Sequence, residues 1–160
     1  MINTSPDKQY GAIDPDQRAK LTGLEFVQGF VDGSLPQNTM ARTLNYDIVE
    51  VTTGRVVVTS TPSTEFLNPE GTVHGGVAAT LLDTCMGLAV RSTLGKGLGS
   101  VALEFKISFV RPITVDSGLV RAIGSVLNCG RRVATAEGRL VDGADRLLAH
   151  GTTTCIVFER

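Results

Sequence analysis

The sequence predicts an α+β domain in which a curved antiparallel β-sheet wraps around one long apolar helix. Residues 75–92 contain no proline and are rich in good helix formers, so they predict the long helix. Segments with strand character follow one another after it, and two more precede it, which favours antiparallel pairing. The 160 residues, 42% of them hydrophobic, suffice for one domain with a full core.

The beginning of the chain predicts a tail followed by a helix. Residues 1–16 are polar, and we expect them to form an N-terminal tail outside a single domain of residues 17–160. Apolar residues recur at helical spacing over residues 17–31, which predicts a helix at the start of the domain. Asp14 and Asp16 are the candidate N-caps of this helix.

Two strands are expected next, over residues 44–51 and 54–61. The second contains the β-branched run Val56-Val57-Val58-Thr59, which suits a sheet. Residues 62–71 are rich in Ser, Thr, Asn, Pro and Gly and predict an irregular segment before the long helix.

The long helix of residues 75–92 is apolar over most of its surface. At 100° per residue, its small and polar positions fall within a wedge of roughly 100°. This wedge contains Gly76, Thr80, Asp83, Thr84, Gly87 and Arg91.

The remaining chain is expected to be strand-rich. Apolar and polar residues alternate over residues 101–109, which predicts the clearest strand, and the glycines of residues 95–99 predict a flexible connection before it. Three more strands are predicted over residues 119–127, 132–141 and 147–158, with hairpin turns at 128–130 and 142–145.

Composition excludes several classes of protein. The formal net charge is −1, only 5% of residues are aromatic and there is no Trp, so a nucleic-acid binder is not expected. Three cysteines without a C-x-x-C motif and only two histidines disfavour a disulfide scaffold or a metal site. Neither a signal peptide nor a membrane span is recognisable, so we expect a cytoplasmic protein.

The segment that leads into the long helix has the residues expected of a catalytic site. The start of a helix presents unpaired backbone N–H groups and the positive end of the macrodipole, which stabilise a developing oxyanion. Gly75 and Gly76 let a substrate carbonyl approach this backbone closely. His74 and Asn68 add side-chain donors, and Asp83 adds a carboxylate further along the helix.

Spacing along the helix predicts a homodimer. Gly75 and Asp83 are eight residues apart, which is about 12 Å along a helix axis. An oxyanion donor must lie about 3 Å from its oxygen, and a base must lie equally close to the atoms it serves. One helix cannot bring both groups to one small carbonyl, whereas two antiparallel copies can. We therefore expect composite sites that use both chains.

The pattern N-P-x-G-x-x-H-G-G, followed by Asp83, resembles the hotdog-fold acyl-CoA thioesterases, in particular the PaaI-type subfamily of phenylacetate degradation. The resemblance covers nearly the whole chain, including residues 105–112 and 130–132. It implies the hotdog fold and hydrolysis of an acyl-CoA or aryl-CoA to a carboxylic acid and free CoA. It implies no cofactor, because CoA is part of the substrate. The sequence leaves open whether dimers associate further into a homotetramer, and which acyl group is cleaved.

The resemblance also implies roles for individual residues. The backbone N–H of Gly75 would polarise the thioester carbonyl, and Asp83 would act as general base or nucleophile. Asn68 would position water or the carboxylate, and His74 would order the loop or contact the thioester. Further substrate-binding candidates are Gly76, Ser100, Ala102, Arg111, Gly130, Arg131 and Arg132. The arginines suit the phosphates of the CoA arm.

Structural interpretations remain open beside these roles. His74 is also a candidate helix cap, Asn68 a candidate turn residue, and Arg131 and Arg132 a candidate solvent-facing hairpin tip. Two other functions remain open as well: a hotdog enoyl-CoA hydratase or dehydratase, and a non-catalytic acyl-CoA-binding module. Candidate lining residues for an acyl pocket are Phe66, Leu67, Met86 and Val90.

Overall fold

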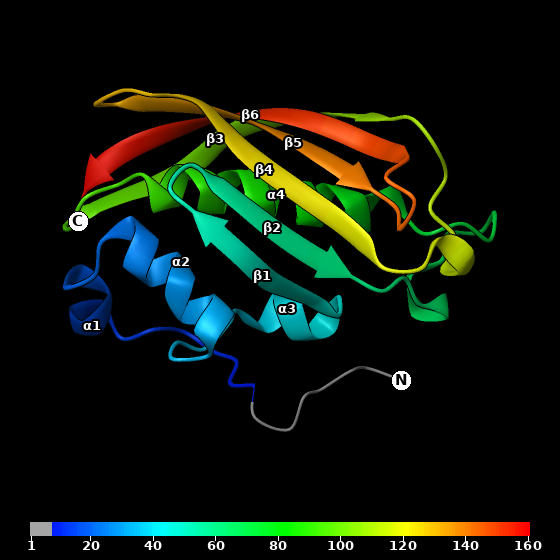
Figure 1. Cartoon of the computed structure of the whole chain (residues 1–160), viewed down its shortest axis with the longest axis horizontal. Coiled ribbons are helices and arrows are strands. Elements are labelled where there is room, and N and C mark those ends of the chain that lie inside the picture. The colour runs from blue at the N-terminus through cyan, green and yellow to red at the C-terminus, as the bar shows by residue number, and fades with distance from the viewer. Residues whose placement is uncertain (1–7) are drawn as a thin grey trace.

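The computed structural model describes residues 8–160, and within that range one antiparallel sheet dominates the fold (Figure 1). Its strands lie side by side in the order β1-β2-β4-β5-β6-β3. All neighbouring strands pair antiparallel. The strands are β1 (Tyr46–Thr52), β2 (Arg55–Ser60), β3 (Leu98–Phe109), β4 (Val120–Cys129), β5 (Val133–Val141) and β6 (Leu147–Glu159).

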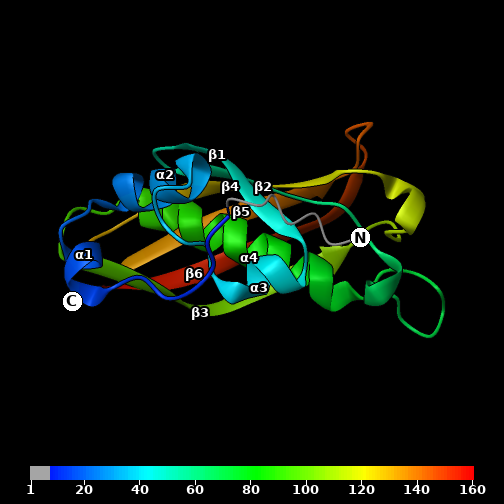
Figure 2. The same cartoon turned by 90° about the horizontal axis from the view of Figure 1, so that it is seen from below.

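The sheet curves over the long helix α4 (Gly75–Ser92), which runs beneath it along the length of the molecule (Figure 2). Leu81, Leu82 and Met86 on α4 are fully buried against the sheet. Gly124 on β4 allows the close approach, because a Cβ at this position would lie 2.3 Å from the carbonyl oxygen of Cys85. The predicted α+β class, with a curved antiparallel sheet around a long helix, is confirmed.

The start of the domain differs from the prediction of one helix over residues 17–31. Two helices occupy this region, α1 (Pro15–Ala19) and α2 (Gly23–Asp32). They are separate because Thr22 and Glu25 form a capping box that begins α2. Asp14 caps α1 through the backbone N–H groups of residues 16 and 17, as one of the two predicted caps.

Part of the predicted tail belongs to the folded body. The N–H of Gly11 donates to the carbonyl of Gln37 at 2.9 Å, and Lys8 forms an ion pair with Asp47. The boundary at residue 16 was therefore placed too late, because residues 9–11 pair with the segment that follows α2. Residues 1–7 of the predicted tail lie outside the described residues.

Smaller elements and strand ends also differ from the prediction. A short helix, α3 (Thr39–Thr43), is capped by Asn38, and two 3₁₀ turns, η1 (Thr64–Phe66) and η2 (Val115–Ser117), occupy connections. Strand β3 begins at Leu98, so the expected glycine connection is shorter than residues 95–99. Strand β4 extends through Cys129, which moves the hairpin turn toward residues 130–132. No helix of residues 8–160 is long and apolar enough to cross a membrane.

Candidate active site

The first turn of α4 is capped by His74. The Nδ1 atom of His74 accepts a hydrogen bond from the N–H of Gly76 at 2.9 Å, and the carbonyl of His74 accepts from the N–H of Val77. Since Nδ1 is an acceptor here, the ring proton of neutral His74 lies on Nε2. A Cβ at Gly76 would lie 2.9 Å from Nδ1, so glycine leaves room for the cap. This contact fits the capping role that the sequence left open.

The N–H of Gly75 is the donor that this cap leaves free. Its neighbours at Gly76 and Val77 both donate to His74, whereas no acceptor lies within hydrogen-bond reach of the Gly75 N–H among residues 8–160. A Cβ at Gly75 would lie 3.0 Å from Cζ of Phe109 on β3. The helix therefore offers one unpaired amide, at its positive end, where a developing oxyanion is best stabilised.

The side chain of Asn68 forms its hydrogen bonds within the loop before α4. Its Oδ1 accepts from the N–H groups of Glu70 and Thr72 at 3.0 and 3.2 Å, and its Nδ2 donates to Oγ1 of Thr72 at 2.9 Å. These contacts close a turn around Pro69 and Gly71 and match the turn-forming interpretation of Asn68. They hold the segment that delivers His74 and Gly75 to the helix start.

Asp83 lies two turns further along α4, half-buried at one end of a cavity of about 430 Å³. Burial raises the pKa of its carboxyl above the ordinary value of 3.8. Asp83 forms no ion pair or side-chain hydrogen bond within residues 8–160, so both carboxylate oxygens are available to a ligand or water. A raised pKa makes the ionised carboxylate a better proton acceptor.

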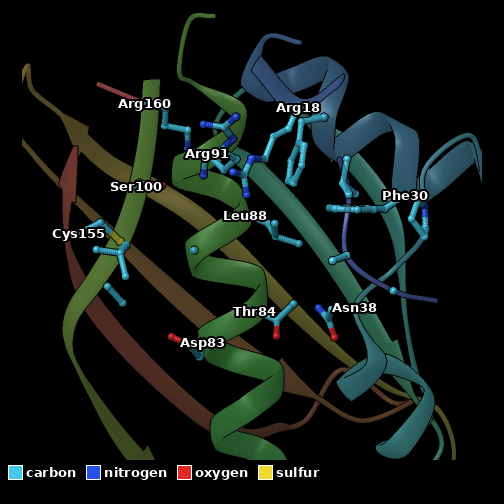
Figure 3. A pocket seen from close by; sticks show the side chains of 18 residues that line it. Arg18, Phe30, Asn38, Asp83, Thr84, Leu88, Arg91, Ser100, Cys155 and Arg160 are labelled. Carbon is cyan, nitrogen blue, oxygen red and sulfur yellow. The ribbon is translucent and has the colours of Figure 1, made fainter. Parts of the chain in front are cut away.

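The cavity at Asp83 extends along α4 under the N-terminal helices (Figure 3). Ser100 and Ala102 on β3, two of the substrate-binding candidates, line it. Its other walls come from α1, α2, α4 and Arg160, the residue after β6, and of these the sequence indicated only the α4 positions in the wedge with Asp83. These walls include Arg18, Phe26, Phe30, Leu88, Arg91 and Arg160.

The acyl-pocket residues suggested by the sequence do not line this cavity. Met86 and Val90 are fully buried in the core under the sheet, since they lie on the apolar face of α4. Phe66 and Leu67 lie in and beside η1, before the start of α4. A single periodicity cannot separate the core face of α4 from a pocket face, and a role of these four residues in an acyl pocket stays a prediction.

Other predicted site residues line two further cavities. Gly75 and Arg111 lie at a cavity of about 330 Å³ beside Phe109, where Nη1 of Arg111 donates to the carbonyl of Leu147 at 2.7 Å. Gly130, Arg131 and Arg132 line a third, of about 630 Å³, at the β4–β5 hairpin. Within one chain, therefore, Gly75 and Asp83 do not share a cavity.

Strand β3, which carries Ser100 and Ala102, is an exposed edge of the sheet. It follows β6 at the end of the strand order and spans 12 residues. Val101, Leu103 and Phe105 are 54%, 60% and 43% exposed. A long apolar edge strand presents unpaired backbone groups that readily pair with another chain.

Residues 8–160 contain no group of three or more His, Cys, Asp or Glu side chains placed to hold a metal ion. The groups described above at these cavities are one carboxylate, one free backbone amide and several guanidinium groups.

Comparisons with known proteins place this site in a family context. Residues 70–149 match the model of the thioesterase superfamily, and this match contains the cap, the free amide and Asp83. Acyl-coenzyme A thioesterase PaaI of Escherichia coli is 30% identical over 109 residues, which are 68% of this chain and 75% of PaaI. A proposed esterase of Halobacterium salinarum is 40% identical over 89 residues, 54% of this chain but only 57% of that relative.

Solved structures agree with this relationship. The E. coli PaaI structure superposes with a TM-score of 0.74 at 25% identity, covering 82% of this chain and 93% of PaaI. A Streptococcus mutans protein bound to acetyl-CoA superposes with a TM-score of 0.65 at 27% identity, covering 72% of this chain and 90% of that protein.

Proposed function

Because this chain belongs to the thioesterase superfamily, we propose that it hydrolyses an acyl-CoA to a carboxylic acid and free CoA, using Gly75 and Asp83. The family membership and the hotdog fold agree with the resemblance to PaaI-type thioesterases stated from the sequence. The observation that carries the proposal is the unpaired N–H of Gly75 at the start of the helix that also carries a half-buried Asp83.

The free amide of Gly75 suits the thioester carbonyl. As water attacks the carbonyl carbon, negative charge develops on the carbonyl oxygen. The N–H of Gly75 and the dipole of α4 stabilise that charge, since both are oriented before the reaction begins. His74 contributes by holding the neighbouring amides, so that Gly75 remains the available donor.

Asp83 supplies the proton acceptor. As a general base it takes a proton from the attacking water, the carbon–sulfur bond breaks, and the proton passes to the leaving thiolate to give the CoA thiol. As a nucleophile it would instead form an acyl anhydride that water then hydrolyses to the same products. Both routes need Asp83 ionised, so activity requires a pH above its raised pKa.

The site needs two chains, because Gly75 and Asp83 of one chain are separated by about two helical turns and face different cavities. A homodimer joined through β3 resolves this separation. The exposed apolar edge of β3 would be covered, and the half-exposed wedge of α4 would face its counterpart on the partner. Each Gly75 then meets the other chain's Asp83.

The exposed guanidinium groups of Arg131 and Arg132 support binding of the CoA phosphates at the β4–β5 hairpin. Neither side chain has a hydrogen-bond or ion-pair partner in the described part of the chain. Structural relatives that contain acetyl-CoA or CoA support a CoA ester as the ligand. Arg111, which already donates to Leu147, lies beside Gly75 at the opposite end of α4 from this hairpin, so it would assist from the partner chain of the dimer.

A thiol-release assay over a panel of acyl-CoA and aryl-CoA esters tests this proposal. We expect thiol release from at least one ester, and its abolition in Asp83→Asn. Crotonyl-CoA should lose its thioester without prior loss of the conjugated double bond. Loss of the double bond without thiol release would instead indicate a hydratase, and tight binding without any reaction would indicate a binding module.

A further inference from the structure

The cavity at Asp83 has opposite charges at its two ends. Among the residues that line the cavity, Asp83 is the one with an acidic side chain. Three arginines also line the cavity: Arg18, Arg91 and Arg160. Figure 3 shows the three guanidinium groups together at the end away from Asp83, with Leu88 and Ser100 between. They come from α1, the last turn of α4 and the residue that follows β6, so the fold brings three distant segments to this point.

Arg91 gives this end of the cavity the character of an anion-binding site. The residue is only 4% exposed, and its Nε has no hydrogen-bond partner in the part of the chain that the structure describes. Burial and the neighbouring charges of Arg160 and Arg18 lower the pKa of Arg91 to about 10. A buried cation without an anionic partner is costly, and two further cations increase that cost.

The contacts that Arg91 does make do not compensate its charge. Nη1 donates to the carbonyl of Leu98, and the guanidinium lies 5.0 Å from the ring centre of Phe26. Both partners are neutral. Arg18 and Arg160 form no ion pair within residues 8–160. An anion at this position would satisfy all three groups at once.

We propose that this cavity accepts an acyl group whose far end carries a carboxylate, and that Arg18, Arg91 and Arg160 bind that carboxylate. The proposal rests on the proposed function and names its substrate class, the ω-carboxyacyl-CoA esters. The apolar side chains of Leu88, Phe26 and Phe30 would contact the methylene chain between the two polar ends.

Helix geometry sets the length of chain that fits. Asp83 and Arg91 are eight residues apart on α4, about 12 Å along its axis. The reacting carbonyl would lie at Asp83 and the carboxylate at Arg91, so the acyl group must be of medium length. A CoA phosphate is a less suitable occupant, because the candidate phosphate contacts Arg131 and Arg132 line a different cavity.

Matched pairs of esters test the proposal with the full chain. We expect suberoyl-CoA to be hydrolysed with a kcat/KM at least about tenfold above that of octanoyl-CoA, because charge-assisted hydrogen bonds contribute at least that much. The same order should hold for sebacoyl-CoA against decanoyl-CoA. A wild-type preference for the uncharged member of each pair would overturn the proposal.

Arg18→Gln isolates the charge effect, because the Arg18 side chain forms no hydrogen bond or ion pair within residues 8–160. This variant should lower kcat/KM for suberoyl-CoA at least about tenfold and leave that for octanoyl-CoA unchanged. The control is Arg139→Gln at an exposed position on β5, which also removes one positive charge. It should leave kcat/KM for both esters unchanged. Equal losses for all CoA esters in Arg18→Gln would show that Arg18 binds the phosphates of CoA, and would overturn the proposal.

Calorimetric titration separates failure of this inference from failure of the proposed function. Suberate should bind Asp83→Asn more tightly than the uncharged octanamide does, and Arg18→Gln in that background should abolish the difference. Suberate binding by a protein that hydrolyses no CoA ester would refute the thioesterase proposal while supporting the carboxylate site. Equal affinity for suberate and octanamide would refute the carboxylate site.

Discussion

Gly75 and Asp83 belong to the same helix, yet they line different cavities of the chain. Their separation of eight residues corresponds to about 12 Å along the axis. The oxyanion donor and the base of one reaction must both lie within about 3–3.5 Å of the reacting atoms. This geometry is the physical reason for proposing a site shared between two chains, and the predictions below follow from it.

The first prediction concerns the carboxylate. Asp83→Asn should fold and dimerise but lose at least about two orders of magnitude in kcat, the usual size of a general-base contribution. The amide keeps the size of the side chain, so a loss reports chemistry rather than packing. The control is Glu137→Gln at an exposed position on β5, which also removes one negative charge. It should retain activity. Near-normal turnover by Asp83→Asn would rule out the mechanism.

The second prediction concerns the free amide of Gly75. Gly75→Pro removes the N–H at the first helical position, where proline is well tolerated, and the ψ of 134° at His74 already suits a residue before proline. We expect kcat to fall by about 10²–10³, as for loss of one oxyanion donor. Gly75→Ala adds a Cβ near Phe109 but keeps the N–H, so it should retain more activity. Equal losses in both variants would indicate a steric effect instead.

The third prediction concerns pH and stability. Burial raises the pKa of Asp83 in the folded state above its unfolded value. Between these two values the folded chain binds more protons than the unfolded chain, so this group's contribution to stability falls as pH rises. Asp83→Asn should therefore unfold at a higher temperature than wild type at neutral pH, and the difference should vanish below the unfolded pKa. Thermal unfolding of both proteins over a pH series checks this; a constant difference would contradict it.

The fourth prediction separates capping from catalysis at His74. His74→Asn replaces the cap with a residue that is favoured at N-caps, so stability and activity should both persist. His74→Ala removes the acceptor of the Gly76 N–H and should lower the free energy of unfolding by about 0.5–2 kcal/mol. Denaturant unfolding and thiol-release rates measure the two effects. A large loss of kcat in His74→Asn with unchanged stability would give the imidazole a direct catalytic role.

The fifth prediction concerns the β3 edge. Leu103→Glu places a charge on the exposed apolar face of β3, and two copies would meet across a dimer interface there. We expect a monomer in analytical ultracentrifugation and loss of thiol release. Leu127→Glu on β4, where the wild-type leucine is 57% exposed, is the matched control and should leave the assembly unchanged. An active monomer of either variant would contradict the shared site.

The spacing of apolar residues was sufficient to predict the helices and strands whose residues follow a regular local pattern. Helix α4 begins and ends where the sequence predicted, and the alternation in β3 identified that strand within three residues. The division of the first helix was missed, because the capping box at Thr22 interrupts an apolar pattern that otherwise continues. Contacts of residues 8–11 with Gln37 and Asp47 are long-range and leave no local pattern.

Only the part of the site that lies within a sequence motif could be predicted. The N-P-x-G-x-x-H-G-G segment identified the start of α4, and the structure adds which of its amides is free. The cavity walls were not predictable, because Arg18 and Arg160 come from opposite ends of the chain. Arg91 did lie in the predicted wedge with Asp83, and that shared face was the one available signal.

Complementation between two inactive variants tests the shared site most directly. Differently tagged Asp83→Asn and Gly75→Pro chains can be co-expressed, and the heterodimer purified through both tags. In a two-fold symmetric dimer one of its two sites regains both wild-type groups, so the account predicts roughly half of the wild-type activity. A heterodimer as inactive as the two parent homodimers would contradict a site built from Gly75 of one chain and Asp83 of the other.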